Sequence, residues 1–212
     1  MDGRTFLPRQ TFFSMMDRVM PRFGTAPWCA LSPAVCVHLL LFVHRIEEVD
    51  PGLYFLARDA DEMGLLREAM RVEFEWTLPE GCPPDLPLRR LIKGDARRVA
   101  TQVSCHQAIA GDGAFAVGMI ARFAPSLETH GAWFYRRLFW EAGAIGQVLY
   151  LEAEAAGVGA TGIGCYFDDP VHDLIGLTGT KYQSLYHFTI GGAVVDTRLT
   201  TLPPYDQARR ET

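Results

Sequence analysis

The pattern of apolar and polar residues along the chain predicts a fold of strands and helices. Residues 37–45 are a continuous apolar run, which is typical of a central strand covered on both faces. Shorter apolar runs predict strands over residues 53–56, 114–120 and 185–190. Residues 133–156 carry apolar side chains every three or four positions, which predicts a long amphipathic helix.

Shorter helices and one loop complete this pattern. Helical spacing of apolar residues is found in residues 12–20, 62–70, 95–110 and 171–177. Clustered prolines between residues 79 and 87 indicate a loop. Strands separated by helices predict an α+β fold of three layers (α/β three-layer), in which helices flank a central sheet. The 212 residues fit one domain or at most two small ones. We expect a single domain over residues 1–212, with an irregular N-terminal arm at residues 1–30.

Composition and charge exclude several classes of protein. The 20 basic and 25 acidic residues leave a net charge of −5, whereas a nucleic-acid-binding protein normally has a basic surplus. The longest uninterrupted run of large apolar side chains, residues 39–43, is far shorter than the roughly 20 residues that span a bilayer. No signal peptide is recognised. Five cysteines, an odd number, favour a reducing compartment over a disulfide scaffold. We therefore expect a soluble cytoplasmic protein.

A glycine-rich segment follows the long predicted helix. Residues 157–162, GVGATG, match the dinucleotide fingerprint G-x-G-x-x-G. That motif requires a strand before it and a helix after it, whereas here a helix precedes and residues 163–167 read as extended. A Rossmann-type NAD site is therefore disfavoured. Two explanations remain: a helix end followed by a tight turn, or close approach of the backbone to a flat or bulky group.

Other polar motifs have structural explanations. In Asp168-Asp169-Pro170, an aspartate at the N-cap with proline at the next position is typical of a helix start, and is favoured over a carboxylate or metal site. Cys105 and His106 are adjacent on a predicted helix and point about 100° apart, so they do not pair there. Three histidines in apolar strands are expected as hydrogen-bonded core residues: His38, His44 and His187. We predict no metal site and no catalytic side chain, which suits an enzyme whose cofactor performs the reaction.

The motifs in the C-terminal half of the chain follow one another in an order that resembles that of the nitroreductase superfamily. Residues 139–159 resemble that family's helix of the type G-x-x-x-Q-x-x-x-L-x-A-x-x-x-G-L-G, and the glycine-rich turn at residues 160–169 follows it. A short helix, a strand with Gly191-Gly192 and a late arginine then come in the family's order. The sequence PGLY at residues 51–54 is typical of the branch related to the dehydrogenases of thiazole and oxazole peptide biosynthesis. The resemblance covers about residues 30–200.

The resemblance implies a mixed sheet between helix layers, in an intertwined homodimer with FMN at its interface. The backbone of Gly162, Ile163 and Gly164 would lie along the isoalloxazine edge near N5, where an amide N–H stabilises a developing anionic flavin. Arg198 would bind the FMN phosphate, although it also fits a solvated surface arginine. Ser32 would contact the ribityl chain.

The chain departs from the family at its start. The phosphate-binding motif Arg-Arg-Ser-x-Arg is missing, since Arg4 and Arg9 have the wrong spacing. Either the chain begins just past that motif, or phosphate binding relies on Arg198 with Arg18 or Arg22.

The expected function is that of an FMN-dependent oxidoreductase. Its chemistry would be NAD(P)H-linked reduction or oxidation of a peptide azoline ring. The alternative is a non-catalytic protein of the same fold that acts as a partner or scaffold.

Overall fold

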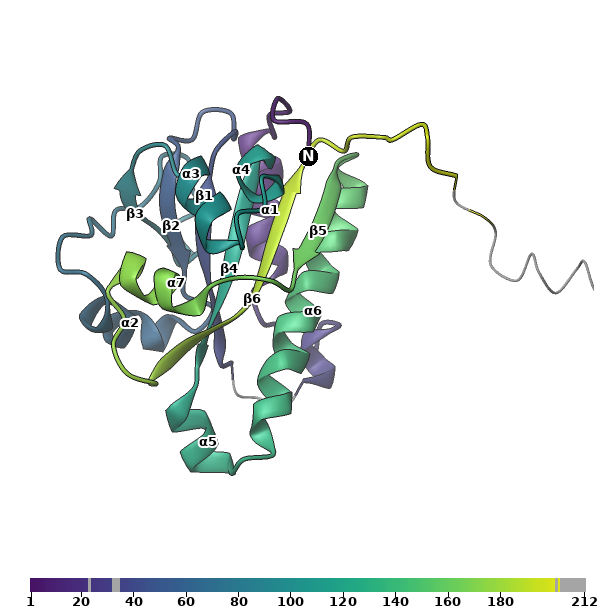
Figure 1. Cartoon of the computed structure of the whole chain (residues 1–212). Helices are drawn as coiled ribbons and strands as arrows, with labels where there is room; N and C mark the ends of the chain where they lie inside the picture. Colours follow the sequence, from purple (N-terminus) through teal and green to yellow (C-terminus); the bar gives the residue numbers. More distant parts are fainter. Residues whose placement is uncertain (23, 32–34, 201, 203–212) are drawn as a thin grey trace, which may run out of the picture.

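A computed structural model describes residues 1–22, 24–31, 35–200 and 202. Its centre is a six-stranded sheet with the strand order β3-β2-β1-β4-β6-β5 (Figure 1). The strands are β1 (Val37–Val43), β2 (Gly52–Leu56), β3 (Leu88–Lys93), β4 (Phe115–Arg122), β5 (Gly159–Ile163) and β6 (Tyr182–Gly191).

Every pairing between these strands is antiparallel, so the expectation of a mixed sheet was wrong in this respect. The first pair shows the reason. The short connection between β1 and β2 turns the chain back on itself, whereas parallel neighbours need a long crossover.

Helices cover both faces of the sheet, as the α+β prediction required. The helices are α1 (Arg9–Arg18), α2 (Met63–Ala69), α3 (Arg97–Val103), α4 (Ile109–Asp112), α5 (Ala124–His130), α6 (Phe134–Ala155) and α7 (Asp168–Ile175), with 3-10 turns η1 (Trp28–Ala30) and η2 (Ala60–Glu62). One apolar core joins α1 and α6 to the sheet, and a second joins α2, α3 and α7 to the opposite face. None of the described helices has the length and apolar character needed to cross a bilayer.

The two cores explain the continuous apolar run of β1. Leu39 and Leu41 point into the core beneath α6, whereas Leu40 and Phe42 point into the core beneath α2 and α3. Successive side chains of a strand face opposite sides, so a strand covered on both faces must be apolar throughout. The prediction of a doubly covered central strand is confirmed.

The long helix is confirmed to within one residue at each end, and Gly157 ends it with φ +70°. The helix predicted over residues 95–110 was wrong in its middle. It divides into α3 and α4, because Cys105 and His106 take left-handed φ values of +53° and +58°. The N-terminal arm contains α1, whose Phe12 and Met16 are fully buried.

A disulfide joins Cys105 to Cys165, which the count of cysteines did not lead us to expect. The two residues lie 60 positions apart, so no local spacing indicates the pair. Cys29 and Cys82 are free thiols, and the buried Cys36 Sγ accepts a hydrogen bond from Ser126 Oγ at 3.6 Å.

Candidate functional site

The glycine-rich segment forms β5, an edge strand that pairs with β6 and lies beside α6 (Figure 1). It follows the long helix and leads into a non-helical segment, residues 164–167, which we call the strap. No helix begins directly after the glycines. The Rossmann arrangement is therefore absent here, as the sequence analysis expected.

Gly162 is held between two tyrosines. Its backbone N–H donates to Tyr150 Oη of α6 at 2.8 Å. On the other side, Tyr186 Oη of β6 occupies the space that a Cβ at residue 162 would need. Burial raises the pKa of Tyr186, so its phenol keeps the proton at neutral pH. Internal packing therefore accounts for glycine at this position.

Ile163 and Gly164 face opposite environments. The Ile163 side chain is 2% exposed and packs in the core beneath α3 and α7. Gly164 is exposed, and no atom lies within 4 Å of the position where its Cβ would stand. A buried side chain thus fixes the strand, while the next peptide is open to a ligand. This open backbone fits a flat group such as a flavin ring.

A polar cluster lies beneath the strap. His187 of β6 makes hydrogen bonds with Ser104 Oγ at 3.1 Å and Ser184 Oγ at 3.3 Å. Tyr166 stacks on its ring with the centroids 4.7 Å apart. Burial lowers the pKa of His187 to about 4, so the ring is neutral at physiological pH. The prediction of a hydrogen-bonded core histidine is confirmed for His187.

Of the other two histidines, His44 is also buried and hydrogen-bonded as predicted, whereas His38 differs from the prediction. His44 makes one hydrogen bond, between its Nε2 and the carbonyl oxygen of Ala110 at 3.0 Å. His38 is fully buried, and within the described residues neither of its ring nitrogens has a hydrogen-bond partner. Burial lowers the pKa of His38 to about 3. Because the neighbouring ring of Phe55 offers no acceptor, the apolar core leaves this imidazole unsatisfied.

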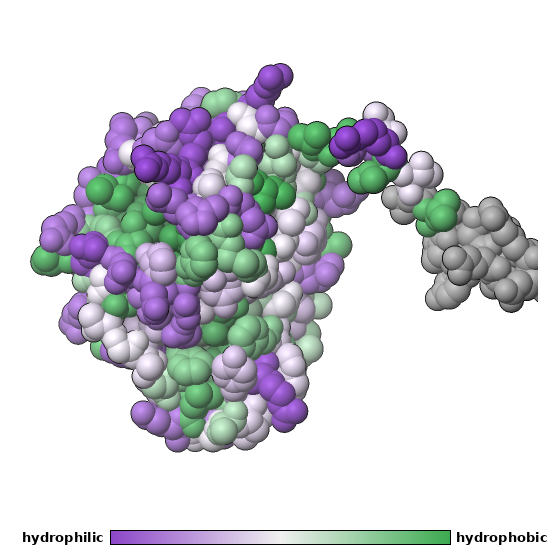
Figure 2. All heavy atoms as spheres, in the orientation of Figure 1, coloured by the Kyte–Doolittle hydropathy of each residue, from purple (hydrophilic) through white to green (hydrophobic). Residues whose placement is uncertain are grey.

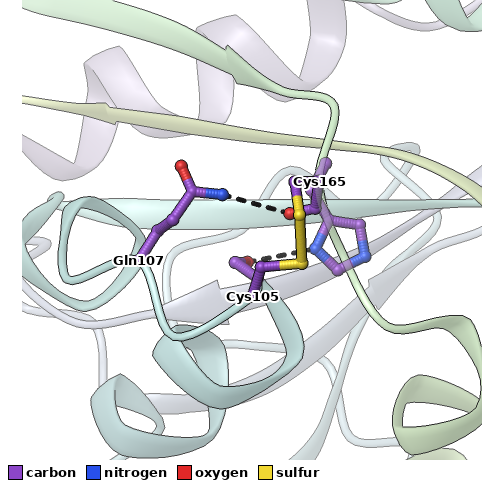
Figure 3. The surroundings of a disulfide bond; sticks show 5 residues. Cys105, Gln107 and Cys165 are labelled. Atoms are coloured by element: carbon purple, nitrogen blue, oxygen red, sulfur yellow. Dashed lines mark hydrogen bonds between the residues drawn. A yellow bond between two sulfur atoms is a disulfide. The ribbon is translucent and has the colours of Figure 1, made fainter.

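The disulfide ties the strap to the turn between α3 and α4 (Figure 3). Gln107 Nε2 donates to the Cys165 carbonyl oxygen at 3.1 Å, and the Phe167 N–H donates to the Val103 carbonyl oxygen at 2.8 Å. The sequence pattern does not indicate this connection, because the apolar spacing over residues 95–110 predicts a continuous helix.

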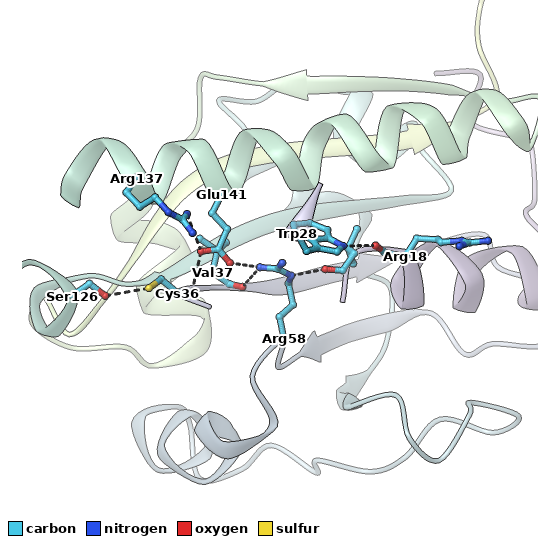
Figure 4. Close-up of polar contacts among 9 residues, drawn as sticks. Arg18, Trp28, Cys36, Val37, Arg58, Ser126, Arg137 and Glu141 are labelled. Atoms are coloured by element: carbon cyan, nitrogen blue, oxygen red, sulfur yellow. Dashed lines mark hydrogen bonds and ion pairs between the residues drawn. The ribbon is translucent and has the colours of Figure 1, made fainter. Parts of the chain in front are cut away.

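A buried ion pair anchors the other end of α6 (Figure 4). Arg58 pairs with Glu141 and also donates to the carbonyl oxygens of Val19 at 2.7 Å and Val37 at 2.9 Å. Glu141 Oε2 accepts from the Cys36 N–H at 3.1 Å. The pair thereby joins α6, α1 and the start of β1. Its signal in the sequence was a glutamate on the apolar face of the long helix.

The other predicted binding residues lie apart from β5. Arg198 is on the tail that leaves the body of the molecule after β6 (Figure 1), where it pairs with Asp196 at 2.7 Å. Arg18 and Arg22 line a pocket between α1, η1 and α6. Ser32 lies outside the described residues. Within one chain, the cationic residues considered for phosphate binding are therefore not assembled around Gly164.

The aspartate pair begins α7, but not with the expected cap. Phe167 is the N-cap residue, and Asp168 and Asp169 occupy the first turn. Asp168 accepts a hydrogen bond from Gln183 Nε2 at 2.8 Å. Both carboxylates complement the positive end of the helix. Across the described ranges, no group of three or more metal-ligating side chains is found.

An exposed apolar face runs along α6. Its members include Trp133, Trp140 and Leu151, of which Trp140 is 56% and Leu151 61% exposed. The surface over α5 and the adjoining start of α6 is also partly apolar (Figure 2). Such a face on a long helix is typical of an interaction surface.

Comparison of the sequence with known proteins gives one family. Residues 82–192, just over half of the chain, match the sequence model of the Nitroreductase family. No curated protein matches the chain in sequence.

Solved structures share the fold. A candidate nitroreductase from Anabaena variabilis is 18% identical with a TM-score of 0.69, over 91% of this chain and 35% of that protein. This chain thus spans about a third of that protein's length. In the E. coli microcin synthetase McbBCD complex with truncated pro-MccB17, one chain is 18% identical with a TM-score of 0.62, over 92% of this chain and 66% of that chain. The NADPH:FMN oxidoreductase of Vibrio harveyi, complexed with NAD+, is 12% identical with a TM-score of 0.50, over 97% of this chain and 77% of that chain.

Proposed function

The chain belongs to the nitroreductase family, and from this premise we propose that it is an FMN-dependent oxidoreductase. The observation that carries the proposal is the exposed end of β5, which lies inside the matched region, residues 82–192. At Gly164 the backbone is open, while the buried side chain of Ile163 holds it in place. A rigid backbone without side chains suits contact with a planar ring.

The proposed roles follow from these surroundings. Bound FMN supplies hydride transfer, so no acid or base side chain is assigned. The backbone of Gly162, Ile163 and Gly164 would contact the flavin edge. The Gly162 N–H donates to Tyr150 in the free chain, so a contact through this amide requires Tyr150 to release it. The open peptide at Gly164 carries no such requirement.

A second copy of the chain would complete the site. Arg198 is proposed to bind the FMN phosphate and Ser32 the ribityl chain. Arg198 has an 87% exposed side chain on the tail, so it is available to a neighbouring protomer. The apolar face of α6, which includes Trp140 and Leu151, is the proposed dimer interface. Burying this face would remove large apolar side chains from water and so favour association.

The electron partner is proposed from two structural relatives. The oxidoreductase of Vibrio harveyi is named for NADPH and FMN, and the microcin synthetase complex holds truncated pro-MccB17. We infer a reaction of one of two types. Either NAD(P)H reduces the flavin, or a peptide azoline ring reduces it and is itself oxidised.

A non-catalytic role is the rival proposal. It is favoured by the two tyrosines at Gly162, because Tyr150 holds the amide and Tyr186 fills the space beside it. In that case the glycines serve the fold, and the protein acts as a partner or scaffold without flavin.

Titration with FMN distinguishes the two proposals. Quenching of flavin fluorescence should saturate at one FMN per chain in the wild-type protein. Gly164→Val should weaken binding at least about tenfold, because the new side chain would occupy ligand space without touching protein atoms. Gly64→Ala, at another open glycine in α2, is the matched control. Absence of binding by the wild-type protein would favour the scaffold role.

A further inference from the structure

We propose that Cys105–Cys165 is a redox-active disulfide that exchanges with thiol reductants and thereby fastens or releases the strap. The pair is half exposed: Cys165 lies at the surface, and Cys105 is partly buried. An external thiolate therefore reaches the Cys165 sulfur more readily. Exposure of this kind separates exchangeable disulfides from buried structural ones.

The backbone on one side of the bond is strained. Cys105 and His106 are consecutive non-glycine residues with φ +53° and +58°, a region that disfavours L-residues by roughly 1 kcal/mol each. This turn interrupts what the sequence pattern predicts as one helix, and it brings Cys105 to Cys165 with their Cα atoms 5.8 Å apart. When the disulfide opens, the backbone of this turn is free to relax from its strained conformation.

Few polar contacts duplicate the covalent link. The hydrogen bonds from Gln107 to Cys165 and from Phe167 to Val103 join the same two segments, and Gln107 is bonded at an exposed site. At the β5 end of the strap, the buried Ile163 fixes the strand, and no neighbouring group packs against Gly164. At the other end, Tyr166 remains stacked on His187. Reduction should therefore leave the strap held only by these noncovalent contacts, while the core stays intact.

The exchange balances as a two-electron reduction. A thiolate attacks Cys165 Sγ, the bond to Cys105 breaks, and Cys105 leaves as a thiolate that takes a proton from solvent. A second external thiolate then attacks the mixed disulfide at the sulfur that came from the first external thiol. This step releases Cys165 as a thiolate, which takes up a proton, and forms the oxidised reductant. Two external thiols become one disulfide, and one protein disulfide becomes two thiols.

The chain carries its own controls for the test. Cys29 is an exposed free thiol that reports reagent access, whereas the buried side chains of Cys36 and Cys82 report unfolding. Burial raises the pKa of both buried thiols, which further slows their alkylation.

The experiment uses the full chain without flavin, so it is independent of the proposed function. Free thiols are first blocked, the protein is equilibrated with millimolar reduced and oxidised glutathione in varied ratio, and new thiols are alkylated and located by mass spectrometry. We expect Cys105 and Cys165 to become labelled together while Cys36 and Cys82 stay unlabelled. Brief exposure followed by acid should trap glutathione on Cys165.

Two results would overturn the exchange. Labelling of the pair only when Cys36 and Cys82 also react would make it a structural disulfide. Labelling before any reductant is added would mean that no bond forms.

Hydrogen exchange tests the strap. We expect amides of residues 164–167 to exchange about tenfold faster after reduction, with β6 unchanged. Cys165→Ser should reproduce the effect without reductant. It is preferred to a change at Cys105, whose positive φ would confound the result. Unchanged exchange in the strap of the reduced protein would contradict its release.

Discussion

The hydroxyl of Tyr186 occupies the space in which a side chain at Gly162 would begin. We expect Gly162→Ala to lower the free energy of unfolding by about 1–3 kcal/mol, because the new methyl group would overpack a well-filled site. Urea denaturation measures the loss. Tyr186→Phe should restore only part of it, since ring carbon Cζ would still lie 2.8 Å from the added Cβ. The control is Gly164→Ala, in open space, which should change stability little. Equal losses at both glycines would refute the contact.

The buried pair of Arg58 and Glu141 should be essential to stability. Glu141→Gln leaves the Arg58 charge buried without its counter-charge, which we expect to lower the free energy of unfolding by about 3–5 kcal/mol. Glu152→Gln makes the same change on the same helix at a more exposed pair with Arg18, and should lower it by less than about 1 kcal/mol. Similar denaturation midpoints for the two variants would contradict this assignment.

The buried neutral His187 should make stability depend on pH. Its pKa falls from 6.5 to about 4 on folding because of burial. Between these values the unfolded chain binds a proton that the folded chain does not, so stability falls as the pH falls. Between pH 7 and pH 5 the free energy of unfolding should therefore fall by about 2 kcal/mol more in the wild-type protein than in His187→Gln. Parallel pH profiles of the wild-type protein and this variant would show that burial does not suppress protonation.

The apolar face of α6 should control association. Trp140→Glu places a charge in the proposed interface, so we expect sedimentation of this variant as a 23.6 kDa monomer, and of the wild-type protein as a dimer. Val72→Glu, at a residue 91% exposed in the turn after α2, is the control and should remain dimeric. A dimer that survives Trp140→Glu would move the interface elsewhere.

Periodicity predicted the parts of the fold whose side chains have a regular relation to the core. The run in β1 and the three-to-four spacing in α6 both follow from burial, so the sequence was sufficient to locate these elements. The antiparallel course of the whole sheet depends on how the strands connect. Apolar patterning does not specify that course.

The site was less predictable because its contacts join distant positions. The link between Cys105 and Cys165 spans 60 residues and depends on a left-handed turn within an apparent helix. The packing of Tyr186 against Gly162 likewise depends on the register of β6 with β5. The sequence pattern marks the glycines as special but leaves open whether a tight turn or contact with a flat group requires them. The structure adds an internal reason for Gly162, while Gly164 remains open.

Anaerobic visible absorption spectroscopy tests the central claim most directly. After reconstitution with FMN, the protein should show flavin bands that bleach when NAD(P)H or an azoline peptide is added, and that return with an electron acceptor. A protein that stays colourless after incubation with FMN, or whose bound flavin no reductant of either class bleaches, would contradict its assignment as an FMN-dependent oxidoreductase.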